Sequence, residues 1–356
     1  MHRRRRRGFT SHYPRLCEYR RRIRWRPPPP RQKGWRHNML SSIGKIVVVA
    51  AVVLATTAAA SSCSGQTMRE RWQQRAAERR ANGGQGPFAA RRMQQQQSMA
   101  LPSGAQVDRN VAYGSDPEQT LDVYRPANAQ NAPVIFMVHG GGWARGDKEA
   151  AGVVNNKVGH WLPKGYIVVS VGYRLVPQVT PMGEAQDVAK ALAFAQGKAR
   201  SWGGDPSRFV LMGHSAGAHL VSLLSAAPSI ATNAGAGSWL GTVALDSAAY
   251  NVVDIMQQSH FSLYDKAFGN DRQLWSDASP TLRLAHAPVP MLLVCSSRRA
   301  DSCAQARGFA DKATSLGGRV SVFPIDLRHG EINAELGASG DLTAQVDGFL
   351  QSLNLP

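Results

Sequence analysis

The chain has 356 residues, 43% of them hydrophobic, which is enough for one large α/β domain plus additional N-terminal sequence. Its formal net charge of +18 would suit a nucleic-acid-binding protein, but the first 38 residues alone carry 13 Arg and one Lys against a single acidic residue. Residues 101–356 carry 20 basic and 21 acidic residues. This part of the chain is nearly neutral, so we predict no specific nucleic-acid partner.

Residues 1–38 include five consecutive Arg and four consecutive Pro and are too poor in apolar residues for a core, so we expect this basic extension to be disordered. From Met39 the pattern changes. Lys45 is followed by the apolar run 46–54 and then by small residues, the outline of a secretory signal peptide. We therefore interpret residues 39–62 as a signal peptide or membrane anchor, with Met39 as the natural start and the preceding residues as an upstream extension.

Three fates fit the segment 39–62. Cleavage near Ala60 is favoured and would release a soluble protein. Lipidation at Cys63 is less favoured, because a large apolar residue usually stands three positions before such a cysteine and Ala60 stands there. Attachment to the membrane by an uncleaved anchor is the third, although the strongly apolar part is short for a span of about 20 residues. All three predict an exported protein, periplasmic or secreted.

The remaining chain divides into a polar linker, 63–104, and one folded domain, 105–356. In the domain, apolar runs alternate with helix-like segments. We predict strands at 107–113, 121–124, 133–138, 166–172, 208–212, 242–245, 290–294 and 319–323, and helices at 183–202, 216–226, 304–316 and 342–353. The first two strands are expected to be antiparallel. The alternation predicts an α/β fold with a mostly parallel sheet covered on both faces, whose ligands lie beyond the carboxyl ends of the strands.

The stretch Gly213-His214-Ser215-Ala216-Gly217 joins a predicted strand to a predicted helix. A G-x-S-x-G motif in this context is typical of a nucleophile elbow, a turn so tight that the positions two before and two after the serine must lack bulk. Such a turn holds the Ser215 hydroxyl at the carboxyl edge of the sheet, with a helix N-terminus behind it. Alone, the motif also fits a glycine-rich turn that happens to contain serine, so the other strand ends decide between the two.

A second glycine-rich turn, His139-Gly140-Gly141-Gly142-Trp143, directly follows the strand predicted at 133–138. Its glycines allow the backbone to turn N–H groups toward a carbonyl oxygen, and together with an elbow such a turn supplies an oxyanion hole. We predict that the N–H groups of Gly141, Gly142 and Ala216 form this hole. We also assign Trp143 to the substrate-binding surface.

Serine needs a base, and if the order along the chain is serine, acid, histidine, the base must follow Ser215. The candidates are His219, His260, His286 and His329. His329 follows the last predicted strand in a turn that would lean over the sheet edge, and no other histidine lies beyond Asp301. We therefore predict His329 as the base.

Three aspartates are candidates for the acid of a Ser-His-Asp triad. Asp301 lies in the loop after the strand 290–294 and is favoured, Asp246 ends the strand before it, and Asp326 lies near His329 and could instead shape its turn. Cys295 and Cys303 lie close to Asp301. They form either a disulfide that would brace this loop or a pair of buried thiols. No metal site is predicted, because no further Cys or His cluster accompanies them.

With these motifs placed, the chain resembles the α/β-hydrolase superfamily, and more closely the carboxylesterases grouped around hormone-sensitive lipase and the feruloyl esterase-like, polysaccharide-processing esterases. The resemblance covers residues 107–353 and includes the segment 173–177 and Asp187. It implies attack of Ser215 on an ester carbonyl, a covalent acyl-enzyme, release by water that His329 activates, and no metal or organic cofactor.

The segment 247–288 leaves room for only a small cap, with aromatic residues in or near it at Trp239, Tyr250, Phe261, Tyr264 and Trp275 that line an acyl pocket or simply pack. A small cap favours short or aromatic acyl groups, on a small-molecule or polysaccharide-linked ester. Two alternatives stay open. The motifs also resemble arylformamidases, which hydrolyse N-formyl amides, and the domain could be a non-catalytic binding protein with a hydrolase fold.

Overall fold

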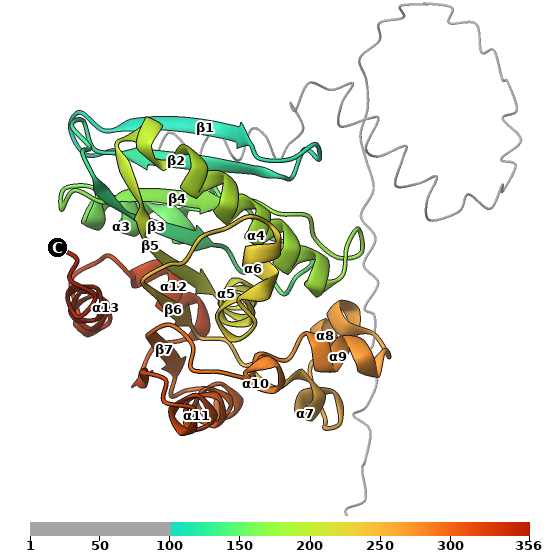
Figure 1. The fold of residues 1–356 in the computed structure, drawn as a ribbon. Coiled ribbons are helices and arrows are strands. Elements are labelled where there is room, and N and C mark those ends of the chain that lie inside the picture. The colour runs from blue at the N-terminus through green and yellow to red at the C-terminus, as the bar shows by residue number, and fades with distance from the viewer. Residues whose placement is uncertain (1–100) are drawn as a thin grey trace, which may run out of the picture. The chain divides into compact units, whose positions relative to one another are not determined.

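The computed structural model describes residues 101–356 (Figure 1). The predicted extension 1–38, the signal segment 39–62 and nearly all of the linker 63–104 lie outside the described residues, as does Cys63. Within the described residues, no helix is both long enough and apolar enough to cross a bilayer.

One eight-stranded sheet forms the centre of the described domain, with strand order β1-β2-β4-β3-β5-β6-β7-β8. The two pairings that involve β2 are antiparallel and the five others are parallel. The strands are β1 (Gln106–Ala112), β2 (Thr120–Arg125), β3 (Ala132–Val138), β4 (Ile167–Val171), β5 (Gly204–His214), β6 (Gly241–Leu245), β7 (Met291–Ser296) and β8 (Val320–Ile325). This arrangement confirms the predicted mostly parallel sheet with an antiparallel start.

Helices cover both faces of this sheet, as predicted. The helices are α3 (Ala151–Trp161), α4 (Pro181–Lys198), the 3₁₀ turn η1 (Ala199–Trp202), α5 (Ala216–Ala226), α6 (Ser229–Asn233), α7 (Val252–Met256), α8 (Ser262–Phe268), α9 (Arg272–Asp277), α10 (Pro280–Arg283), α11 (Ala300–Ser315), α12 (His329–Glu335) and α13 (Asp341–Gln351). On one face, α3, α12 and α13 pack against alternate strand residues; on the other, α4, α5 and α11 pack against the residues between them.

The central strands are apolar because both of their sides are covered. All seven residues of β3 are buried, with Val134, Phe136 and Val138 packed on one face and Ile135 and Met137 on the other. Each such side chain contributes about 1.5–3 kcal/mol by leaving water. A continuous apolar run is therefore the expected pattern for this strand, rather than the alternation of a half-exposed one.

The parallel strands β3, β5, β6, β7 and β8 all end at the same edge of the sheet. The glycine-rich turn 139–143 follows β3, Ser215 follows β5, Asp246 follows β6 and His329 follows β8. The four short helices α7 to α10, grouped together in Figure 1, form the small cap between β6 and β7. The fold thus collects these four chemical groups from separate segments of the chain at one edge of the sheet.

Candidate active site

Ser215 occupies a strained turn between β5 and α5, with φ 56° and ψ −117°. Glycines flank it for a steric reason. A Cβ atom added to Gly213 would lie 2.4 Å from the carbonyl oxygen of Gly217, and one added to Gly217 would lie 2.2 Å from the carbonyl oxygen of Val138. A positive φ is costly for a residue with a side chain and is maintained where the surrounding structure enforces it. The structure therefore gives this segment the geometry of a nucleophile elbow.

His329 is the first residue of α12, and its imidazole reaches the elbow. With the Nδ1–H of His329 directed at a carboxylate, its Nε2 accepts a hydrogen bond from the Ser215 hydroxyl at 3.0 Å. Behind it, the Nε2–H of His214 donates to the main-chain oxygen of His329 at 2.9 Å, and the two ring centroids are 4.5 Å apart. Burial lowers the pKa of His214 to about 3, so His214 is neutral at pH 7.

The structure does not bring the predicted acid, Asp301, to His329. Its carboxylate lies in the first turn of α11, is 46% exposed and contacts Arg299 at 3.4 Å, whereas Asp246 is fully buried and accepts the Nδ1–H of His329 at 2.6 Å. The second alternative, Asp326, is 78% exposed. The physical reason is that α11 begins at Ala300, earlier than predicted, so Asp301 lies in a helical turn that faces solvent.

Four hydrogen bonds hold the Asp246 carboxylate. One oxygen, Oδ1, accepts the main-chain N–H of Ser296 at 2.8 Å and the hydroxyl of Ser302, while Oδ2 accepts His329 and the Nη1 of Arg299 at 2.9 Å. Burial alone would raise the pKa of Asp246. The three hydrogen bonds from His329, Ser296 and Ser302 and the charge of Arg299 outweigh it and hold that pKa well below its usual range. Asp246 is therefore ionised at neutral pH.

The glycine-rich turn lies directly against the elbow. A Cβ atom added to Gly140 would lie 2.9 Å from the Cβ of Ser215, and Gly141 and Gly142 have φ of 136° and 60°, conformations that favour glycine. The hydroxyl of Tyr173 donates to the carbonyl of His139 at 2.7 Å and fixes the start of the turn. Ala216 begins α5, so its N–H has no partner within the helix.

Trp143 has a different environment from the predicted one. Only 3% of it is exposed, its indole N–H donates to His219 Nδ1 at 3.1 Å, and its ring packs edge-on against Phe268. His219 in turn donates to the carbonyl of Ala278 at 2.7 Å. This chain of contacts joins the glycine-rich turn to the cap beneath the surface, so Trp143 is a packing residue with no exposed face for substrate.

A groove of about 570 Å³ lies between the cap and α11. Its lining mixes aromatic, polar, acidic and small aliphatic residues, namely Asn251, Asp254, Ile255, Gln258, Ser259, His260, Phe261, Tyr264, Thr281, Asp301, Ala304, Gln305 and Gly308. Of the aromatic residues considered above, Phe261 and Tyr264 line this groove, whereas Trp239, Tyr250 and Trp275 are at least 92% buried in the packing. Tyr264 interacts electrostatically with Arg299, whose guanidinium also binds the Asp246 carboxylate, and this contact connects the groove to Asp246.

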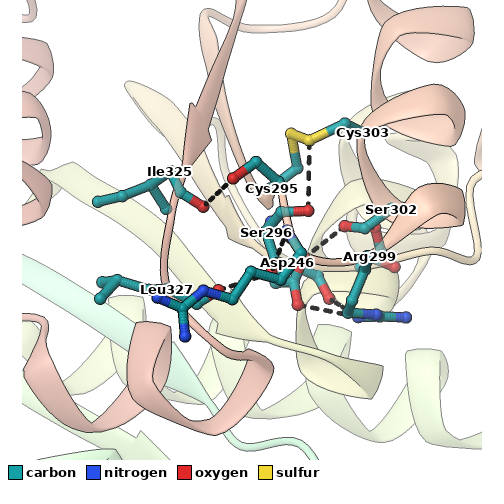
Figure 2. Close-up of a disulfide and its surroundings, with 11 residues drawn as sticks. Asp246, Cys295, Ser296, Arg299, Ser302, Cys303, Ile325 and Leu327 are labelled. Carbon is teal, nitrogen blue, oxygen red and sulfur yellow. Dashed lines mark hydrogen bonds and ion pairs between the residues drawn. A yellow bond between two sulfur atoms is a disulfide. The ribbon is translucent and has the colours of Figure 1, made fainter.

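Cys295 and Cys303 form a disulfide, with Cα atoms 5.1 Å apart (Figure 2). Among residues 101–356, no cluster of three or more His, Cys, Asp or Glu side chains is arranged to hold a metal ion.

The sequence did not predict the contacts that Arg299, Ser302 and His214 make in this site. His214 had one available signal, because it directly precedes the serine of the elbow.

Comparison with known proteins fits this arrangement. The BD-FAE family model matches residues 121–263. The chain is 32% identical over 163 residues to the probable isoprenylcysteine alpha-carbonyl methylesterase ICMEL1 of Oryza sativa subsp. japonica, covering 44% of this chain and 38% of that protein. It is 26% identical over 232 residues to Esterase LipC of Mycobacterium tuberculosis, covering 58% of this chain and 55% of that protein. The chain therefore spans well under two thirds of either relative.

Among solved structures, Esterase B from Lactobacillus rhamnosis superposes with a TM-score of 0.60 at 21% identity, covering 79% of this chain and 95% of that one. This likeness confirms the α/β-hydrolase fold. The family model and the curated relatives each match only part of the chain, so what the comparisons show together is the α/β-hydrolase fold, with esterases among the similar proteins.

Proposed function

We propose that this protein is a serine carboxylic ester hydrolase in which Ser215, His329 and Asp246 form the catalytic triad. The observation that carries the proposal is the continuous hydrogen-bonded chain from the Ser215 hydroxyl through both nitrogens of His329 to the buried, ionised Asp246. Serine, base and acid in this order and geometry activate a hydroxyl that is otherwise a poor nucleophile.

In the proposed reaction, His329 Nε2 takes the proton of Ser215 as Oγ attacks the ester carbonyl. Asp246 stabilises the imidazolium that forms, because its carboxylate stays charged. The N–H groups of Gly141, Gly142 and Ala216 stabilise the oxyanion, and losing one such donor typically costs about 3–4 kcal/mol of barrier. His329 then protonates the leaving alcohol, and a water molecule that His329 deprotonates releases the acid from the acyl-enzyme.

Short or aromatic acyl esters are the proposed substrates, either small molecules or esters linked to a polysaccharide. Two features support this. The cap consists of helices of four to seven residues, too short to enclose a long acyl chain, and Leu263 of α8 lies close to Gly142, where it narrows the space above the glycine-rich turn. The groove lined by Phe261 and Tyr264 offers a mixed aromatic and polar surface for the rest of the substrate.

We also propose that the protein functions outside the cytoplasm. The disulfide between Cys295 and Cys303 supports this proposal, because disulfides persist in oxidising compartments. Detection of the protein in the periplasm or medium of the native cells, with both cysteines oxidised, would agree with it. Purely cytosolic protein with reduced cysteines would contradict it.

A serine-reactive fluorophosphonate tests the chemistry directly. We expect it to label the wild-type protein and not the Ser215→Ala variant, and we expect p-nitrophenyl acetate hydrolysis to disappear with the label. Comparison of p-nitrophenyl esters of increasing length, a feruloyl ester and N-formylkynurenine then tests the substrate class. Absence of labelling would favour a binding protein, faster turnover of N-formylkynurenine would favour a formamidase, and preference for long chains would refute the small-pocket argument.

A further inference from the structure

The loop closed by the disulfide surrounds the acid of the proposed triad. Cys295 lies near the end of β7 and Cys303 in α11, so the bond closes the short segment 295–303 where β7 leaves the sheet. Asp246, which comes from the neighbouring strand β6, points into this loop (Figure 2).

Three of the four hydrogen bonds to Asp246 come from this loop. They are donated by the main-chain N–H of Ser296, by the side chain of Arg299 and by the hydroxyl of Ser302. Only the fourth comes from His329. The side chains of Ser302 and Asp246 are both fully buried, so bulk water does not reach the hydrogen bond between them.

Two of these donors are direct neighbours in sequence of the disulfide-bonded cysteines. Ser296 directly follows Cys295 and Ser302 directly precedes Cys303, so each donor is one residue from a cross-linked position. A bond between the two cysteines therefore fixes the separation of the two groups that hold Oδ1 of Asp246 from either side. Positioning within about 0.5 Å is what catalytic constellations require of such supporting groups.

The same loop is also attached to the segment that carries the base. The Ser296 hydroxyl donates to the carbonyl of Leu327 at 2.6 Å, and the N–H of Ser297 donates to the carbonyl of Ile325 at 2.9 Å. Leu327 is two residues before His329. The loop thus holds the acid directly and the base through the backbone that precedes it.

We propose that the disulfide-closed loop 295–303 is the device that positions Asp246 against His329, with Ser302 as a positioning residue for the proposed reaction. This inference rests on the proposed function. It assigns a role in turnover to a disulfide and a serine that contact neither the Ser215 hydroxyl nor the oxyanion turn.

The test compares Ser302→Ala with Ser297→Ala, a matched control in the same loop whose hydroxyl is exposed and bonds only to a main-chain carbonyl of Ile325. With p-nitrophenyl acetate, we expect Ser302→Ala to lower kcat about 10-fold with KM unchanged, since a hydrogen bond to a charged group is lost. Ser297→Ala is expected to match the wild type. The double variant Cys295→Ala/Cys303→Ala should lower kcat in the same direction, measured well below its melting temperature.

A double-mutant cycle separates positioning from general structural damage. In an Asp246→Asn background, Ser302→Ala should cause no further loss of kcat if it acts through this carboxylate. The inference is overturned if Ser302→Ala keeps wild-type kcat, or if its loss adds in full to that of Asp246→Asn. These results are distinct from failure of the proposed function, in which the wild-type protein itself neither hydrolyses the ester nor reacts with a fluorophosphonate. If the cysteine variant does not fold, the serine variants and the double-mutant cycle still test whether Ser302 positions Asp246.

Discussion

Replacing Asp246 by Asn tests the proposed acid most directly, because the amide removes the charge at nearly constant shape. The two sides of the carboxylate face donors only, namely Ser296 and Ser302 on Oδ1 and His329 and Arg299 on Oδ2. An amide has one oxygen, so either orientation points its NH₂ group at two donors. With the NH₂ toward His329, the imidazole changes tautomer and Nε2 can no longer accept the serine proton.

The opposite orientation is no better, because the NH₂ group then faces the main-chain N–H of Ser296, which cannot rotate away. Loss of the acid by such a substitution lowers kcat by about 10⁴-fold in the Ser-His-Asp template. We expect a fall of about 10³–10⁴-fold here, equivalent to roughly 4–5.5 kcal/mol of barrier. Asp301→Asn is the matched control and should stay within about twofold of the wild type, since its carboxylate is half exposed and touches neither Ser215 nor His329.

Steady-state kinetics with p-nitrophenyl acetate, supported by circular dichroism to verify folding, measure both variants. The fluorophosphonate labelling rate gives a second reading that does not depend on the leaving group. The reasoning is refuted if the Asp301 variant loses activity as severely as the Asp246 variant, or if folded Asp246→Asn retains activity within 10-fold of the wild type.

Three further predictions concern the fold that supports the site and its stability. Gly217→Ala should yield inactive or unfolded protein in labelling and circular dichroism, because its Cβ would lie 2.2 Å from a backbone oxygen; normal activity would contradict this. Removing the disulfide by Cys295→Ala/Cys303→Ala should lower the free energy of unfolding in urea by about 2–3 kcal/mol, as expected for a short loop, and an unchanged value would contradict the chain-entropy argument. Burial raises the pKa of Glu184 to about 9, so the folded state retains a proton that the unfolded chain releases near pH 4. Stability should therefore fall as pH rises from about 4 toward 9, and Glu184→Gln should flatten this dependence in urea titrations at pH 5 and 8.

The parts of the fold that were predictable are those governed by local constraints. Helix α5 occupies the predicted residues Ala216–Ala226 because the elbow fixes its first turn and its apolar residues continue without interruption. The helix predicted at 183–202 instead begins at Pro181 and becomes a 3₁₀ turn after Lys198, ending at Gly203 with φ 82°. Helix α3 was not predicted, since its sequence mixes glycine, asparagine and valine, all weak helix formers, and tertiary packing against α12 stabilises it.

The choice between Asp246 and Asp301 as the acid could not be made from the sequence for a different reason. Asp246 and Asp301 both follow strands that end at the same edge of the sheet, so their sequence contexts are equivalent. What separates them is the start of α11 at Ala300 and the positive φ of Asp246, 54°, which belongs to the turn that directs its side chain toward His329. Neither feature can be read from the residues on either side of the two aspartates.

From its position in the sequence, the loop after β7 is expected to carry the acid, but in the structure it donates hydrogen bonds to Asp246. A carboxylate in this loop would need its own hydrogen-bond donors, yet the loop already supplies the donors of Ser296, Arg299 and Ser302 to a carboxylate from the next strand. The guanidinium Nη1 of Arg299 also lies 3.0 Å from His329 Nδ1, so the loop after β7 places a cation, and not a second carboxylate, beside the imidazole. With Asp246, which follows β6, as the proposed acid, the loop after β7 supports that acid, and the disulfide that closes this loop lies beside the proposed triad.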